Sequence, residues 1–148
     1  MNIFSQNKHL IIIDIALFAA SVVILTGIIV LAVNPNLQPQ QSRNAERAED
    51  VQLMLDGIYD YALANNGLFP SSIEIIPGEV CAQEPCDELV DLSMLLDPVT
   101  YITEIPRDPQ CPKKCAENGT GYTVFLNDTG RVTVTAEHAE QVSISATR

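Results

Sequence analysis

The feature that most constrains this chain is an apolar segment that runs from Leu10 to Val33. It contains one charged residue, Asp14, and otherwise only apolar or small side chains. At about 1.5 Å per residue, a helix of this length extends roughly 36 Å, against a hydrocarbon core of about 30 Å. The apolar region of a secretory signal peptide is usually only about 7–15 residues long. Residues 10–33 are therefore predicted to be a retained transmembrane helix.

The distribution of basic residues predicts the orientation of this helix. Lys8 lies in the short leader-like segment of residues 1–9, and no Lys or Arg follows the helix until Arg43. Because basic residues favour the cytoplasmic side, the leader is expected in the cytoplasm and the rest of the chain outside.

The net charge of −11 belongs entirely to the segment that follows residue 42, since Lys8 and Asp14 cancel before it. A surface with this much negative charge repels phosphate backbones. Direct binding of nucleic acid is therefore not expected. The two histidines, His9 and His138, belong to no recognisable catalytic motif. We expect a protein that is not an enzyme, with no catalytic residues.

A second helix is predicted over residues 43–65, after a proline-containing hinge at residues 34–42. Ser42 or Asn44 could cap its start. Its apolar residues recur at helical spacing and should pack on a sheet; they are Val51, Leu55, Ile58 and Ala62. The helix is expected to end at Asn65-Asn66-Gly67 in a left-handed conformation.

The C-terminal segment alternates between apolar and polar residues, which is typical of strands. Three such runs lie near residues 122–126, 132–136 and 142–146, with a predicted turn at residues 127–130. We therefore expect an irregular region over residues 66–120 and an antiparallel sheet over residues 121–147. The predicted fold class is α+β, a long N-terminal helix packed on a small antiparallel sheet.

Several strings resemble those of type IV pilins and type II secretion pseudopilins. Residues 59–70 (YDYALANNGLFP) resemble the end of the family's helix, and residues 101–109 (YITEIPRDP) resemble the stretch before its sheet. The resemblance implies a structural subunit, major or minor, of a cell-surface or secretion filament that assembles through its N-terminal helix. The implied partners are other copies or related pilin subunits, the membrane, the prepilin peptidase and the inner-membrane assembly machinery.

The family's N-terminal motif is altered in this chain. His9 stands where the family has Gly before the cleavage point, Leu10 replaces the aromatic residue after it, and Asp14 replaces Glu. The resemblance implies cleavage between His9 and Leu10, and pairing of Asp14 with the freed amine of a neighbouring subunit. In the alternative, Asp14 reaches the headgroups or Lys8, and the chain is an uncleaved, membrane-anchored surface or binding protein that does not polymerise.

The chain contains four cysteines, and their expected role is structural. They are Cys81, Cys86, Cys111 and Cys115. On the outer side, two disulfides are expected in one of three pairings, stabilising a middle region with few apolar residues. A zinc site on all four cysteines is the alternative.

The prediction includes no cofactor, although acidic residues gather near the first two cysteines. Calcium binding is the alternative to a solvated loop there, with candidate ligands Glu84, Asp87, Glu88 and Asp91.

Overall fold

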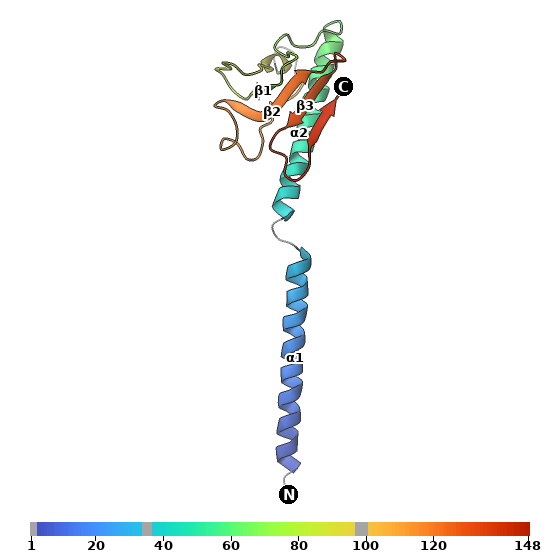
Figure 1. Cartoon of the computed structure of the whole chain (residues 1–148), viewed down its shortest axis with the longest axis vertical. Helices are drawn as coiled ribbons and strands as arrows, with labels where there is room; N and C mark the ends of the chain where they lie inside the picture. Colours follow the sequence, from blue (N-terminus) through green and yellow to red (C-terminus); the bar gives the residue numbers. More distant parts are fainter. Residues whose placement is uncertain (1–2, 34–36, 97–100) are drawn as a thin grey trace. The chain divides into compact units, whose positions relative to one another are not determined.

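A computed structural model of the chain describes residues 3–33, 37–96 and 101–148, and within the first helix the side chains of residues 11–29 (Figure 1). Contacts divide the chain into two compact units, residues 1–39 and 40–148, each described here by itself. The elements, in chain order, are α1 (Ile3–Val33), α2 (Leu37–Ala64), β1 (Gly78–Cys81), the short 3-10 helix η1 (Ser93–Leu95), β2 (Gly119–Leu126), β3 (Val132–Ala136) and β4 (Ile144–Thr147). This arrangement confirms the predicted α+β class.

Both long helices begin before their predicted starts. α1 begins at Ile3 rather than at residue 10, because residues 3–9 contain no Pro or Gly to stop a helix. α2 begins at Leu37 rather than at residue 43, since Pro39 occupies its first turn, where a backbone N–H has no partner within the helix.

The predicted hinge at residues 34–42 is therefore helical from residue 37 onward, and residues 34–36 lie outside the described residues. Ser42 and Asn44 lie inside α2 and cap neither of its ends.

The C-terminal end of α2 matches the prediction more closely. The helix ends at Ala64, and Asn66 and Gly67 follow with φ values of 59° and 83°. The Gly67 N–H donates to the Ala62 carbonyl at 2.7 Å, which satisfies one of the last free carbonyls of the helix. The left-handed ending is confirmed.

The sheet is antiparallel throughout, in the order β1-β2-β3-β4. The three predicted strands are present, and the β2–β3 turn forms as predicted, with Gly130 at φ 73° donating to the Asn127 carbonyl. The predicted irregular region, residues 66–120, contains β1 and η1, and β2 starts at Gly119 rather than at residue 121. β1 was not predicted, because its four residues (GEVC) are too few to show an alternation of apolar and polar side chains.

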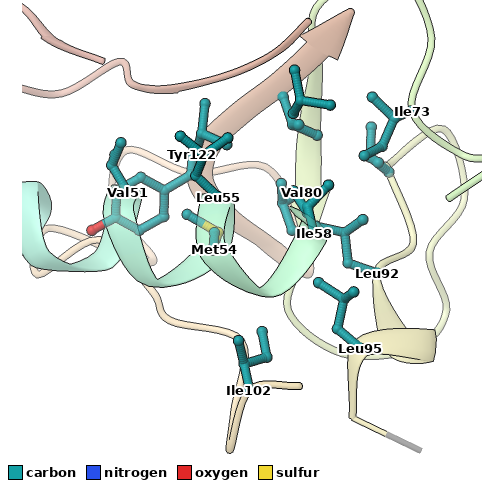
Figure 2. Packing of buried hydrophobic residues seen from close by; sticks show 14 of the residues in the cluster. Val51, Met54, Leu55, Ile58, Ile73, Val80, Leu92, Leu95, Ile102 and Tyr122 are labelled. Atoms are coloured by element: carbon teal, nitrogen blue, oxygen red, sulfur yellow. The ribbon is translucent and has the colours of Figure 1, made fainter. Parts of the chain in front are cut away.

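The core lies between α2 and the sheet (Figure 2). Val51, Met54, Leu55 and Ile58 point from α2 into it, and each is at most 4% exposed. From the sheet side the buried residues include Tyr122 and the inward residues of β2 and β3. The amphipathic face of α2 therefore packs against the sheet, as expected.

The middle region contributes more to this core than its composition suggested. Its buried apolar side chains, among the described residues, include Ile73, Val80, Val90, Leu92, Leu95 and Ile102. The expectation of a middle region with few apolar residues therefore understated its contribution to the core, because these residues follow no periodic pattern along β1, η1 and the loops that contain them.

Replacing Ile58 with Asp is expected to abolish the cooperative unfolding of the second unit. Ile58 is fully buried, so the substitution places an unpaired charge in the core. Gln52→Asp, on the exposed face of the same helix, is the matched control and should shift stability by no more than about 0.5 kcal/mol. Thermal melting checks both variants, and a full cooperative transition in Ile58→Asp would show that α2 packs differently.

Candidate membrane anchor and buried ion-pair cluster

The described part of α1 has the length and composition of a membrane span. The stretch Ile11–Ile29 is 19 residues long, and all of its side chains are exposed. At about 1.5 Å per residue it extends roughly 28 Å, close to the thickness of a hydrocarbon core. By length and composition the helix could therefore cross a bilayer. A signal sequence near an N-terminus can have the same length and composition.

Two of the three polar side chains in this stretch are satisfied within the helix. The Ser21 hydroxyl donates to the Phe18 carbonyl at 2.7 Å, and the Thr26 hydroxyl donates to the Val22 carbonyl at 2.8 Å. Asp14 is exposed and has no partner among the described residues. A carboxylate in the middle of a bilayer costs about 2.5–3.5 kcal/mol on insertion scales, and Asp14 lies three residues after the start of the apolar stretch.

The predicted cleavage point lies inside α1. His9 and Leu10 are helical in backbone, and their side chains lie outside the part that the structure describes. In the sequence, Asp14 follows Leu10 by four residues, which is about one helical turn.

The second unit contains a buried ion pair between Arg47 of α2 and Asp108 in the loop before β2. Both side chains have 0% exposure, and Arg47 Nε lies 2.6 Å from Asp108 Oδ2. Arg47 Nη2 donates to Asp108 Oδ1 at 3.1 Å and to Gln110 Oε1 at 3.0 Å, and Nη1 donates to Asn44 Oδ1 at 2.9 Å. The Arg47 guanidinium therefore has hydrogen-bond partners on several sides, and its contacts attach residues 108–110 to α2.

A second pair lies one turn earlier on α2. Arg43 donates from Nε and Nη2 to the two carboxylate oxygens of Glu140, each at 2.7 Å. The side chain of Asn44 makes two hydrogen bonds to the backbone of Glu140. Its Nδ2 donates to the Glu140 carbonyl, and its Oδ1 accepts from the Glu140 N–H. These contacts attach the β3–β4 connection to the same end of α2.

The hydrogen bonds described above form a cluster of Arg43, Asn44, Arg47, Asp108 and Glu140. They favour the ionised state of its two carboxyl groups, those of Asp108 and Glu140. Burial alone would raise the pKa of Asp108, but hydrogen bonds from Arg47 and the Gln110 N–H hold it below its usual value. Hydrogen bonding from Arg43 lowers the pKa of Glu140 to about 2.

The pKa of a third carboxylate, that of Asp50 on α2, shifts in the opposite direction. Burial raises the pKa of Asp50, although Tyr122 donates its hydroxyl proton to Asp50 Oδ2. Burial and this same hydrogen bond raise the pKa of Tyr122. The phenol therefore remains a donor throughout the physiological range.

The lowered pKa of Glu140 predicts a loss of stability in acid. A carboxylate whose folded pKa is depressed stabilises the fold above its unfolded pKa, and this contribution is lost as the pH falls through the folded value. The loss should fall between about pH 4.5 and pH 2. Melting temperatures measured across this range should fall less steeply in Glu140→Gln than in the wild type. Parallel curves would show that Glu140 does not contribute in this way.

The buried cluster was not predicted from the sequence, although one signal points to Arg47. Arg47, Val51, Met54 and Ile58 follow one another at intervals of four, three and four residues, so Arg47 lies on the buried stripe of α2. A basic residue in that position needs a buried acid, but the sequence does not identify Asp108, 61 residues further on.

The cysteines form two local disulfides, Cys81–Cys86 and Cys111–Cys115. Two disulfides were expected, and the structure decides between the three pairings. The zinc alternative needs all four sulfurs at one point. Within the described residues, no three His, Cys, Asp or Glu side chains gather closely enough to hold a metal ion.

The candidate calcium ligands are likewise not brought together. Glu84, Asp87 and Glu88 are exposed, and Asp91 accepts a hydrogen bond from the Ser93 N–H at 2.8 Å. That bond stabilises the start of η1, which gives Asp91 a structural role.

Comparison of this chain with protein-family models, curated proteins and solved structures finds no match.

Proposed function

We propose that this chain is a structural subunit of a type IV pilus-like or type II secretion-like filament, assembled through α1. The observation that carries the proposal is Asp14, an acid with no partner among the described residues, in a helix whose other described polar side chains are satisfied internally. The order of an apolar helix, an amphipathic helix and an antiparallel sheet supports it, as do the pilin-like strings at residues 59–70 and 101–109.

In the proposed assembly, α1 helices from many copies pack into a common apolar core. Cleavage between His9 and Leu10 would free an amine at Leu10, and Asp14 of a neighbouring subunit would pair with it. An ion pair in a low-dielectric environment is much stronger than one in water, so it would fix the axial register of the packed helices.

The proposed location of the second unit is outside the cytoplasm. The basic Lys8, which precedes the apolar stretch Ile11–Ile29, favours a cytoplasmic N-terminus. The two disulfides agree with this, because disulfides persist in oxidising compartments and are rare in the cytosol. At a cell-surface filament, the acidic units would face the medium.

A second candidate is an uncleaved, single-pass membrane protein that carries the same domain without polymerising. The observation that favours it is the replacement of the family's Gly by His9 and of its aromatic residue by Leu10. In this case Asp14 would lie near the cytoplasmic interface and contact headgroups.

The test is intact mass and N-terminal sequencing of the protein from sheared and membrane fractions of its cells. A mature start at Leu10 in sheared material is the result expected for a filament subunit. A start at Met1 confined to the membrane fraction would overturn the filament proposal and support the anchored protein.

A further inference from the structure

A basic loop stands out on this acidic domain. The loop, residues 111–115, reads Cys-Pro-Lys-Lys-Cys and is closed by a disulfide. Lys113 and Lys114 are exposed, and in the part of the chain that the structure describes neither has an ion-pair partner. Together with Arg43 they line a pocket of about 390 Å³. The positive charge of Arg43 is already paired with Glu140. Two cationic side chains are thus available to an external anion.

The walls of this pocket are rigid. Pro109 and Pro112 fix parts of its backbone, and the disulfide closes a loop of sequence separation 4. Arg43 is held by its two hydrogen bonds to Glu140. Little backbone entropy would be lost on binding, so even a few charge contacts could contribute to affinity.

An acidic loop is attached to the segment that follows the basic loop. This loop, residues 84–88, exposes Glu84, Asp87 and Glu88 and is constrained by the Cys81–Cys86 disulfide. Asn118, three residues after the basic loop, donates from its amide to the Pro85 carbonyl at 3.1 Å. Its backbone carbonyl accepts from the Ala82 N–H at 2.7 Å. The acidic loop is therefore held against Asn118, three residues from the end of the basic loop, and no ion pair joins the two loops among the described residues.

We propose that the basic loop of one copy binds the acidic loop of a second copy. The two loops carry opposite charges and belong to one chain. A two-fold arrangement that places one basic loop against the partner's acidic loop therefore brings the second pair of loops together as well, and both contacts form at once. A polyanion such as nucleic acid would meet the same two lysines but also the repulsion of a chain with net charge −11. The contact goes beyond the filament proposal, since it concerns the acidic domain and does not depend on α1.

Charge exchange tests this contact. Full-length chains are placed one copy per lipid nanodisc in uncharged lipid, which keeps α1 helices apart, and disc pairing is followed by sedimentation velocity. The wild type should pair at about 20 mM salt and weaken at least tenfold at about 500 mM, because the Debye length shortens to a few ångströms. Lys113→Glu/Lys114→Glu should not pair with itself, and neither should Glu84→Lys/Asp87→Lys.

The decisive sample is an equimolar mixture of these two variants, in which every acidic loop again faces a basic one. Mixed pairs are expected to form with wild-type affinity. All four side chains are exposed, so unchanged circular dichroism and melting temperature should show that both variants fold.

Three outcomes would overturn the proposal: a wild type that remains as single discs at low salt, a variant that pairs with itself, or a mixture that does not pair. Sulfate is the probe for small anions. If sulfate shifts the amide signals of Lys113 and Lys114 while the discs remain single, the pocket binds small anions and not a second copy. None of these results bears on whether α1 assembles filaments, which the shear experiment decides separately.

Discussion

Replacing Arg47 with methionine is expected to lower the free energy of unfolding by about 3–5 kcal/mol. Methionine retains much of the side-chain volume, but the change leaves the Asp108 carboxylate buried without its cation. The cost comes mainly from that uncompensated charge and not from the intrinsic strength of the ion pair. Denaturant unfolding followed by near-ultraviolet circular dichroism would measure it, because all four tyrosines lie in the second unit.

Two further variants separate this explanation from a general loss of packing. Arg47→Met/Asp108→Asn removes both charges and should be more stable than Arg47→Met alone. Arg43→Met removes a partly exposed pair one turn away and should destabilise the domain much less than Arg47→Met, because exposed pairs are screened by solvent. Equal losses in Arg47→Met and in the double variant would contradict the buried-charge account.

If the chain assembles through α1 as proposed, replacing Asp14 with asparagine is expected to reduce the filament material released by shearing at least tenfold. The substitution removes the charge with almost no change in shape. A register contact worth about 1.4 kcal/mol or more per subunit would account for a loss of that size. The second unit should melt as in the wild type, since α1 belongs to a separate compact unit. Quantification of sheared and membrane fractions measures the effect.

Two other changes in the same helix serve as controls. Asp14→Glu keeps the charge and should retain most of the assembly. Ser21→Ala removes a hydroxyl that is already satisfied within α1 and should leave assembly unchanged. Filaments formed in normal amount by Asp14→Asn would contradict the charge-pairing role of this residue.

The features that could be predicted from the sequence depend on neighbouring residues. The apolar run of α1, the stripe of α2 and the three alternating strands each repeat a local pattern several times, so the fold class followed from them. The αL ending at Asn66 and Gly67 was predictable for the same reason, because the conformation depends on the residues at those two positions.

The features that could not be predicted depend on long-range contacts. β1 is defined by its pairing with β2, about 40 residues further along the chain, and not by its own four residues. The partner of Arg47 could not be identified, because any of the many acids of this chain could have been brought to it. The start of α2 was misplaced because Pro39 is compatible with a first turn as well as with a hinge.

The two disulfides have a mechanical consequence. Their sequence separations are 5 and 4, so neither one links separate elements of the sheet to α2. A tensile load between the α2 end and the last strand would therefore be resisted by hydrogen bonds, the core and the Arg47 cluster, and not by covalent bonds. Once these yield, nearly the whole of residues 40–148 can extend, at about 3.3–3.6 Å per residue. A domain of this kind would lengthen under force rather than hold a fixed span, and single-molecule pulling would record the gain in contour length directly.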